Sequence, residues 1–352
     1  MLELRLGVRD GEQRNRLLAR EWKLMSDSGK TYAVHLSSGR RWRYRPFGGT
    51  ERWVERFSTF LGIDAGENIS SPTITIMPSP DGAGQDIQPK PGPDRVPQDG
   101  ISRQRLLKRW LPGINLYWQP GSQDILCVLR SSAGPDSELE QMRYALYPIL
   151  EGAVRDGGLP LHAALIERDG AGVLIAAASG VGKSTCCHRL PLPWTVLAED
   201  MTLVVPTAEG GWRAHPLPTW SAVKSGTAQW PCRINESVPV KALLFLIRSE
   251  TDGVEPVEKG AAALGITDCA MICFHYLDRH FRQARQRPMR KRIFENAAAL
   301  AKALPAFSLH ASLTGWFWEK IESIPDRERT RVSHLPPTVR QALPGSRGRK
   351  WS

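Results

Sequence analysis

Residues 173–190 read VLIAAASGVGKSTCCHRL: an apolar run, a glycine-rich turn and a stretch compatible with a helix. The strict phosphate-loop pattern is G-x-x-x-x-G-K-[ST], and the segment from Ala177 to Ser184 matches its last three positions. Ala177 replaces the first glycine, which a strand residue with negative φ tolerates. Gly180 and Gly182 let successive backbone N–H groups curl around an anion. The stretch therefore predicts a phosphate-binding loop between a buried strand and a helix.

This loop predicts ATP as the ligand, with Mg²⁺ beside it. Lys183 can reach the β and γ phosphates, and the Ser184 hydroxyl can ligate the metal. The remaining loop residues are also expected to contact the nucleotide, and they are Ser179, Gly180, Val181, Gly182 and Thr185. A chance glycine-rich turn is the alternative, and the apolar strand before the loop and the helical stretch after it argue against that alternative.

Two adjacent carboxylates, Glu199 and Asp200, follow an apolar segment at 194–198 that we expect to be a strand. In phosphate-loop proteins an acidic residue at such a strand end holds Mg²⁺, directly or through water. One of the pair could orient the metal while the other accepts the proton of an attacking hydroxyl. We predict a metal site formed by Ser184 and Asp200. A surface turn that carries two acids is the alternative.

His162 lies on the apolar segment before the loop strand. In a parallel α/β domain it could reach the phosphates from the adjacent strand end. A histidine between Leu161 and Ala163 is also typical of a core residue with satisfied hydrogen bonds. The residues alone leave both interpretations open.

The 352 residues are enough for two or three domains. We expect a β-rich region, a flexible Pro/Gly-rich linker, a further β segment of the first region, a phosphate-loop domain and a basic tail without regular structure. Their expected bounds are 1–77, 78–100, 101–134, 135–324 and 325–352.

Hydrophobic periodicity gives the elements within these regions. Strands are expected at 2–6, 32–36, 42–45, 114–118 and 125–129 in the first region, and at 161–166, 173–177, 194–198, 201–205 and 240–247 in the second. One amphipathic helix is expected over 138–155 and another over 183–190. The chain after 247 reads as mostly helical up to 324.

Composition narrows the class of protein. Lys and Arg number 47 and Asp and Glu 36, so the net charge is +11, and a basic surface favours anionic partners. Nothing resembles a nucleic-acid fold, and the basic cluster at 279–292 is an ordinary solvated face or a site for an acidic partner. Six cysteines lack paired metal-site spacing and predict reduced thiols. No apolar stretch suits a signal peptide or a membrane span, so we expect a soluble, cytoplasmic protein.

The order of these motifs resembles the HPr serine kinase/phosphorylase superfamily over about residues 155–250. There a histidine opens the strand before the phosphate loop, and an acidic pair, usually Asp-Asp, follows. A closer resemblance is to the SynChlorMet cassette protein family ScmC, and it spans most of the chain. The segments that carry it are Leu159-Pro-Leu-His162, the loop and helix at 180–187, His215-Pro-Leu-Pro-Thr-Trp-Ser221 and the strand at 240–247.

The resemblance implies an α/β fold with a P-loop, HPr-kinase-like C-terminal domain, preceded by a smaller β-rich (α+β) N-terminal region. It implies ATP-dependent phosphoryl transfer to a hydroxyl of a peptide or small protein, within a cassette that includes radical-SAM enzymes and precursor peptides. Relatives in lasso-peptide pathways are peptide serine kinases. By this resemblance Lys183 and the loop amides bind phosphates, Ser184 binds Mg²⁺, His162 contacts phosphate, and Glu199 or Asp200 is base and metal holder.

Two other functions stay open. A non-catalytic or hydrolytic ATP-binding accessory protein would gate a peptide-modifying complex, with the N-terminal region as its docking module. A nucleic-acid ATPase is suggested by charge alone. The segment from His215 to Ser221, stiffened by Pro216, Pro218 and Trp220, could line an acceptor site or serve as a structural connection. The oligomeric state is left open.

Overall fold

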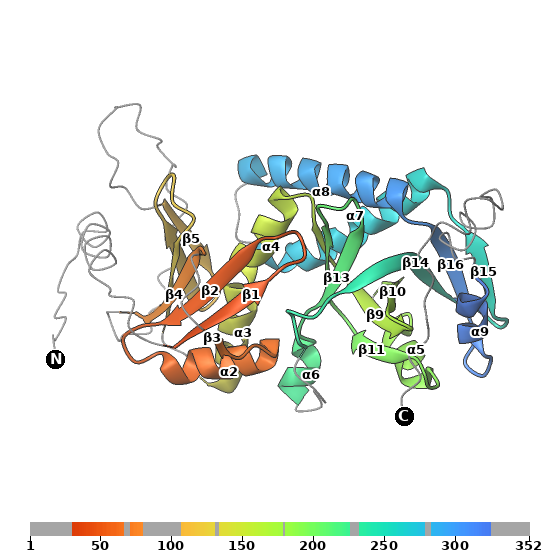
Figure 1. Cartoon of the computed structure of the whole chain (residues 1–352), viewed down its shortest axis with the longest axis horizontal. Coiled ribbons are helices and arrows are strands. Elements are labelled where there is room, and N and C mark those ends of the chain that lie inside the picture. Colours follow the sequence, from red (N-terminus) through yellow and green to blue (C-terminus); the bar gives the residue numbers. More distant parts are fainter. Residues whose placement is uncertain are drawn as a thin grey trace, which may run out of the picture.

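The polypeptide is an α/β structure built on two mixed β-sheets, drawn in Figure 1 from a computed structural model. The structure describes residues 30–66, 71–79, 107–130, 134–178, 180–225, 232–278 and 283–324. Four predicted features lie outside these ranges: the strand at 2–6, Ser179, the linker beyond residue 79 and the basic tail. Within them, the β-rich N-terminal region expected from the sequence is present.

The N-terminal sheet has seven strands in the order β3-β1-β2-β4-β7-β6-β5. Their bounds are β1 Thr31–His35, β2 Arg41–Pro46, β3 Ala65–Gly66, β4 Thr73–Pro78, β5 Leu107–Leu111, β6 Ile114–Trp118 and β7 Ile125–Leu129. Helix α2 (Glu51–Leu61) packs on this sheet, and the Phe57 ring meets the Tyr44 ring edge-on at 5.0 Å. The four strands predicted here within the described residues are confirmed, and Pro78, assigned to the linker, is the last residue of β4.

The single helix predicted over 138–155 is wrong. The structure has α3 (Pro135–Ala145) and α4 (Tyr147–Arg155), which meet at Leu146. Pro148 explains the interruption, because proline has no N–H for the carbonyl four residues earlier and its ring crowds that carbonyl. Helix α4 ends as predicted, with Gly157 in the left-handed region at φ 93°. The two helices lie between the sheets (Figure 1).

The second sheet has nine strands, with the path β11-β9-β10-β14-β13-β12-β8 and with β15 and β16 joined beside β14. Their bounds are β8 Leu159–Leu161, β9 Ala163–Arg168, β10 Ala171–Ala176, β11 Thr195–Ala198, β12 Thr202–Pro206, β13 Trp212–Pro216, β14 Val238–Arg248, β15 Gly253–Pro256 and β16 Ala306–Ala311. Strands β10 and β16 each pair with β14 in parallel, so the carboxyl ends of these three strands meet at one edge.

Two predictions for this sheet need correction. The strand expected at 161–166 is divided at His162, because β8 pairs with β12 while β9 pairs with β10 and β11. The region expected to be mostly helical after 247 contains β15 and β16. Strand β16 reads AFSLHA, and its pairing with β14 across more than 55 residues is a long-range contact that local periodicity does not report.

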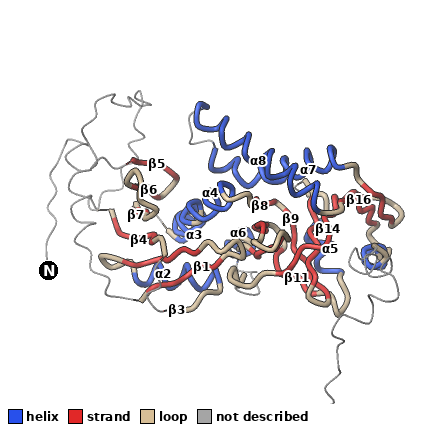
Figure 2. Tube along the Cα trace, turned by 45° about the horizontal axis from the view of Figure 1, so that its top comes forward, coloured by secondary structure: helices blue, strands red, loops and turns tan. Residues whose placement is uncertain are grey.

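Side chains of the central strands alternate between two cores. Leu174 and Ala176 belong to the core that includes α7 (Lys259–Asp278) and α8 (Gln283–Ala303). Val173 and Ile175 belong to the core with α5 (Lys183–Arg189) and α9 (Phe317–Glu322). This period of two is that of a strand buried on both faces. Helix α8 lies along α7 in Figure 2, and no described helix is long and apolar enough to cross a bilayer.

All six cysteines are free thiols, as predicted, and five of them are buried. Burial raises the pKa of the Cys187 and Cys232 thiols to about 12 and that of Cys269 to about 11. Cys127 lies in the N-terminal sheet, whereas Cys186 and Cys187 lie on α5 beside the second sheet. Free thiols therefore lie both in the N-terminal sheet and beside the second sheet.

His215, at the end of β13, joins the second sheet to the N-terminal sheet. Its Nδ1 lies 2.8 Å from the Ile234 carbonyl oxygen, and the Ser37 N–H donates to its Nε2 over 3.0 Å. The two contacts require a neutral imidazole that donates from Nδ1 and accepts at Nε2. The segment from His215 to Ser221 therefore begins as a structural connection.

The His215 contacts predict that the stability of the fold depends on pH. Burial lowers the pKa of His215, and the charge of Arg213 lowers it further, against the Ile234 hydrogen bond. As pH falls below about 6.5, His215 takes up a proton in the unfolded chain more readily than in the folded chain. The folded state therefore loses stability as the pH falls from about 6.5 toward the lowered pKa of His215 in the folded chain. We expect the urea midpoint to fall between pH 7.5 and 5, and His215→Gln to lower the midpoint at pH 7.5 but flatten that fall.

The matched control is His188→Gln, because His188 is an exposed residue of α5. It should keep the wild-type fall in midpoint. An unchanged pH dependence in the His215 variant would show that other groups cause the loss.

Candidate active site

The predicted phosphate loop lies between β10 and α5. Gly180 and Gly182 adopt φ values of 80° and 123°, in the region that favours glycine. No heavy atom lies within 4 Å of the point that a Cβ would occupy on either residue. The backbone conformation, and not crowding, therefore requires glycine at both positions.

Three predicted residues meet beside this loop. Lys183 is only 7% exposed, and its Nζ donates to the Ala177 carbonyl oxygen over 3.1 Å. The same Nζ lies 3.0 Å from His162 Nε2, which in turn lies 2.9 Å from Asp200 Oδ1. His162 reaches this point because it stands between β8 and β9, and its backbone N–H is held by the Cys269 carbonyl of α7. The sequence-predicted lysine, histidine and one carboxylate thus form a single cluster.

The hydrogen bonds of this cluster are not all satisfied. A single nitrogen, His162 Nε2, faces both Lys183 and Asp200, and it can accept from the first or donate to the second, but not both at once. The other ring nitrogen, Nδ1, is buried and has no partner among the described residues. A buried polar atom without a partner costs about 1–3 kcal/mol. The cluster is therefore a costly arrangement for a purely structural role.

Burial and charge act in opposite directions on these groups. Burial lowers the pKa of Lys183, while the nearby Asp200 charge raises it, and the net effect is a lowered pKa. Burial raises the pKa of Asp200, but the hydrogen bond and charge of His162 and the charges of Lys183 and Arg143 outweigh it and lower the pKa. Asp200 therefore stays a carboxylate at neutral pH.

Glu199, the other predicted carboxylate, does not join the cluster. Its Oε1 lies 3.5 Å from His188 Nε2, on the outward side of α5. Ser184 and Thr185 are exposed at the start of α5, and neither makes a hydrogen bond to another described residue through its side chain. Val181 is half-buried against the core under α5. Of the two carboxylates, Asp200 is the one at the loop lysine.

Arg248 is a loop contact that sequence reasoning missed. It is the last residue of β14, and its Nη2 donates to the Gly180 and Val181 carbonyl oxygens over 3.1 and 3.4 Å. A basic residue at the end of an apolar strand was visible in the sequence. Its partner was not, because the parallel pairing of β14 with β10 is a long-range contact.

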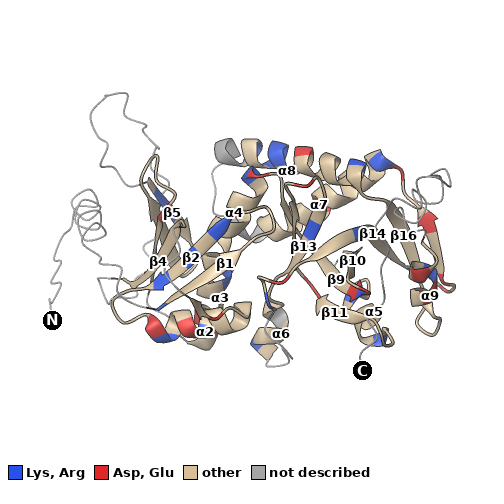
Figure 3. Cartoon of the chain, in the orientation of Figure 1, with Lys and Arg blue, Asp and Glu red and all other residues tan. Residues whose placement is uncertain are grey.

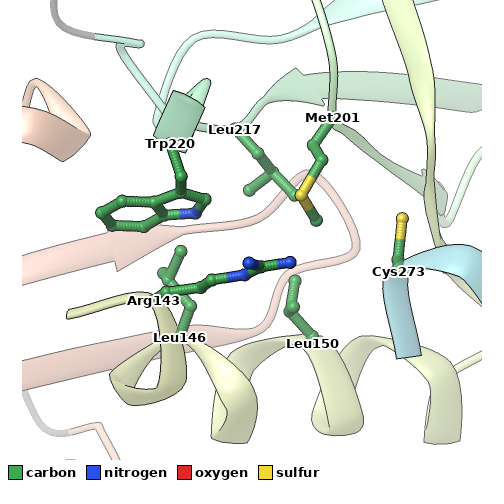
Figure 4. Close-up of a pocket in the computed structure, with 7 residues that line it drawn as sticks. All are labelled: Arg143, Leu146, Leu150, Met201, Leu217, Trp220 and Cys273. Carbon is green, nitrogen blue, oxygen red and sulfur yellow. The ribbon is translucent and has the colours of Figure 1, made fainter. Parts of the chain in front are cut away.

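A small cavity lies next to the Asp200 turn (Figure 4). Its walls are mostly apolar, and they come from Arg143, Leu146, Leu150, Met201, Leu217, Trp220 and Cys273. Leu217 and Trp220 belong to the segment from His215 to Ser221, for which an acceptor-site lining and a structural connection were both left open, and Trp220 begins helix α6 (Trp220–Ser225). The cavity volume is about 20 Å³, enough for one water molecule.

In the part of the chain that the structure describes, Mg²⁺ would be held with the help of phosphate oxygens and water. The described residues contain no group of three His, Cys, Asp or Glu side chains that could hold a metal ion. Mg²⁺ in nucleotide sites is bound by one or two protein oxygens, with phosphates and water completing the shell. An exposed Ser184 hydroxyl and an ionised Asp200 carboxylate fit that donor set.

The members of the basic cluster at 279–292 whose side chains are described are exposed, and Figure 3 shows Lys and Arg segments in blue along α8. Arg292 donates to the Arg155 carbonyl oxygen, and Lys291 pairs with Glu295 at 3.6 Å. Both groups have partners within the fold.

The comparisons with known proteins give one family. No curated protein matches the sequence. A family model described as SynChlorMet cassette protein ScmC matches residues 125–326, which is more than half of the chain and includes His162, Lys183, Asp200 and Arg248. The chain belongs to the SynChlorMet cassette protein ScmC family.

Proposed function

We propose that this protein is an ATP-dependent kinase that phosphorylates a hydroxyl of a peptide or small protein. The observation that carries the proposal is the meeting of Lys183, His162 and Asp200 beside a glycine loop. A lysine ammonium beside a glycine-rich loop and an ionised carboxylate are groups that phosphate-loop enzymes use in phosphoryl transfer. The proposal includes a relationship to the HPr kinase superfamily, supported by the order of histidine, loop and acidic turn along the chain.

In this mechanism Lys183 and the loop amides bind the β and γ phosphates of the substrate ATP. Ser184 and Asp200 would hold Mg²⁺, which neutralises phosphate charge when bound. Asp200 accepts the proton of the acceptor hydroxyl. The hydroxyl oxygen bonds to the γ phosphorus, the bond from that phosphorus to the bridging oxygen breaks, and ADP leaves.

His162 would change its partner during binding. Once phosphate attracts the Lys183 ammonium, His162 Nε2 no longer serves two neighbours and can donate to Asp200 alone. That hydrogen bond orients the carboxylate toward the acceptor. The competition at Nε2 is thereby removed by the substrate.

A second candidate function is suggested by the water-sized cavity that Met201, the neighbour of Asp200, helps to line. A volume of about 20 Å³ can hold one water molecule. A water molecule could replace the acceptor hydroxyl, and the protein would then be an ATP-binding accessory that gates a peptide-modifying complex. Radical-SAM enzymes of the same cassette are the partners proposed for that role.

The test is incubation of the full chain with Mg²⁺, γ-labelled ATP and any short precursor peptide found encoded next to its gene. Label on a peptide hydroxyl is the result expected of the kinase. Released phosphate with an unlabelled peptide supports the gating ATPase. Absence of ATP binding in calorimetry contradicts both functions.

A further inference from the structure

The position of the Lys183 cluster indicates how a nucleotide bound at the loop would be oriented across the sheet. Strand order places β9, and beyond it β11, on one side of β10, and β14 and then β16 on the other. His162 precedes β9 and Asp200 follows β11, so the transferred phosphate belongs on that side of the loop. In the proposed binding mode the nucleoside end of the molecule would extend toward the opposite side, over the ends of β14 and β16.

The carboxyl ends of β14 and β16 are level there, because Arg248 pairs with Ala311 in the sheet register. Ligands of α/β sheets bind outside the carboxyl ends of parallel strands. Arg248 already contacts the phosphate loop from β14. The next segment on this side is the loop at 312–316, which follows β16.

This loop is held rigidly in place. The Ser312 N–H donates to Asp252 Oδ1 over 2.7 Å, and the Gly315 N–H donates to the Ser312 hydroxyl over 2.8 Å. Arg189, the last residue of α5, donates to the carbonyl oxygens of Ser312 and Gly315. A Cβ on Gly315 would lie 2.0 Å from an Asp252 oxygen, so any other residue there would displace the Asp252 carboxylate. The contact with Arg189 joins the loop to the helix that begins at Lys183.

The same loop exposes two large apolar side chains. Leu313 is 72% exposed and Trp316 62% exposed. An indole held on a fixed loop loses little conformational entropy when a flat ring stacks on it. A purine base is such a ring, and its stacking on aromatic side chains is independent of its hydrogen-bond pattern.

We infer that Leu313 and Trp316 form the base-binding subsite of the nucleotide held by the phosphate loop, with Trp316 stacking on the purine. This inference rests on the nucleotide binding of the proposed function. It adds a residue contact for a part of the ligand that the phosphate loop does not recognise.

The test compares two ligands that share phosphates and differ in the base. Binding of Mg-ATP and of Mg-tripolyphosphate to the full-length protein is measured by calorimetry. Trp316→Ala should weaken ATP binding roughly tenfold and leave tripolyphosphate binding unchanged. Trp316→Phe should restore most of the ATP affinity. The control Phe294→Ala, which removes a 47% exposed aromatic from α8, should change neither.

Three outcomes would overturn the inference. Unchanged ATP affinity in Trp316→Ala would leave Leu313 and Trp316 as a surface for a protein partner. If the binding of Mg-ATP and of Mg-tripolyphosphate weakened equally, the loop at 312–316 would support the structure of the phosphate site and would not contact the base. If the wild type binds neither ligand, the inference and the proposed function fail together, whereas the first two outcomes leave the proposed function intact.

Discussion

Asp200→Asn is expected to lower the rate of phosphoryl transfer by about 10²–10⁴-fold while ATP affinity stays within a few-fold of wild type. The amide keeps the size of the carboxylate and an oxygen that can still ligate Mg²⁺, but it cannot accept a proton from the acceptor. It can still contact His162 Nε2, which lies 2.9 Å from Oδ1 in the native chain. Single-turnover transfer of labelled phosphate, with ATP binding measured separately, distinguishes the two effects.

Glu199→Gln is the matched control, since it makes the same chemical change one residue earlier. The native Glu199 carboxylate faces the exposed His188 and not the lysine cluster, so we expect the rate of phosphoryl transfer to fall by less than about tenfold. A large loss in this variant with normal transfer by Asp200→Asn would make Glu199 the base. Because the pKa of Asp200 is already lowered, its titration should not limit the rate between pH 6 and 8.

Lys183→Ala is expected to weaken Mg-ATP binding and to lower kcat/KM by about 10²-fold or more, which corresponds to about 3 kcal/mol or more of transition-state stabilisation. The lysine is the cation of the loop, and its burial strengthens its attraction for phosphate because water screens it poorly. Calorimetry gives the affinity, and initial rates with the peptide give kcat/KM.

Loss of folding must be separated from loss of function in this variant. Removal of the ammonium also removes its contacts with the Ala177 carbonyl and His162. The thermal midpoint and the control Lys291→Ala, an exposed lysine of α8, address that point. Full ATP affinity in a folded Lys183→Ala protein would contradict the site.

The strand, glycine turn and helix around Lys183 were predictable because their sequence signals are local. Two glycines, a lysine and the flanking apolar strand occupy a single stretch of sequence, and the structure has them in the expected order. The order of the motifs along the chain predicted that Asp200 lies near that loop, and in the structure Asp200 contacts His162 beside it.

The remainder depended on long-range pairing. Arg248 reaches the loop only because β14 lies next to β10, and no local pattern gives strand order. The strand containing His162 was predicted as continuous, because its apolar pattern does not show that its two ends join different neighbours. Pro148 was a local signal, and the amphipathic periodicity of its neighbours hid it.

The six free thiols make the opening of this molecule measurable without any added label. Alkylating reagents attack the thiolate, and a buried thiol with a pKa of about 11 or 12 supplies almost none at pH 8. Modification of Cys127 would time the exposure of the N-terminal sheet, and that of Cys187 the exposure of the helix after the phosphate loop. Mass spectrometry of the peptides that contain Cys127 and Cys187 would show whether the two regions open at the same time or one after the other.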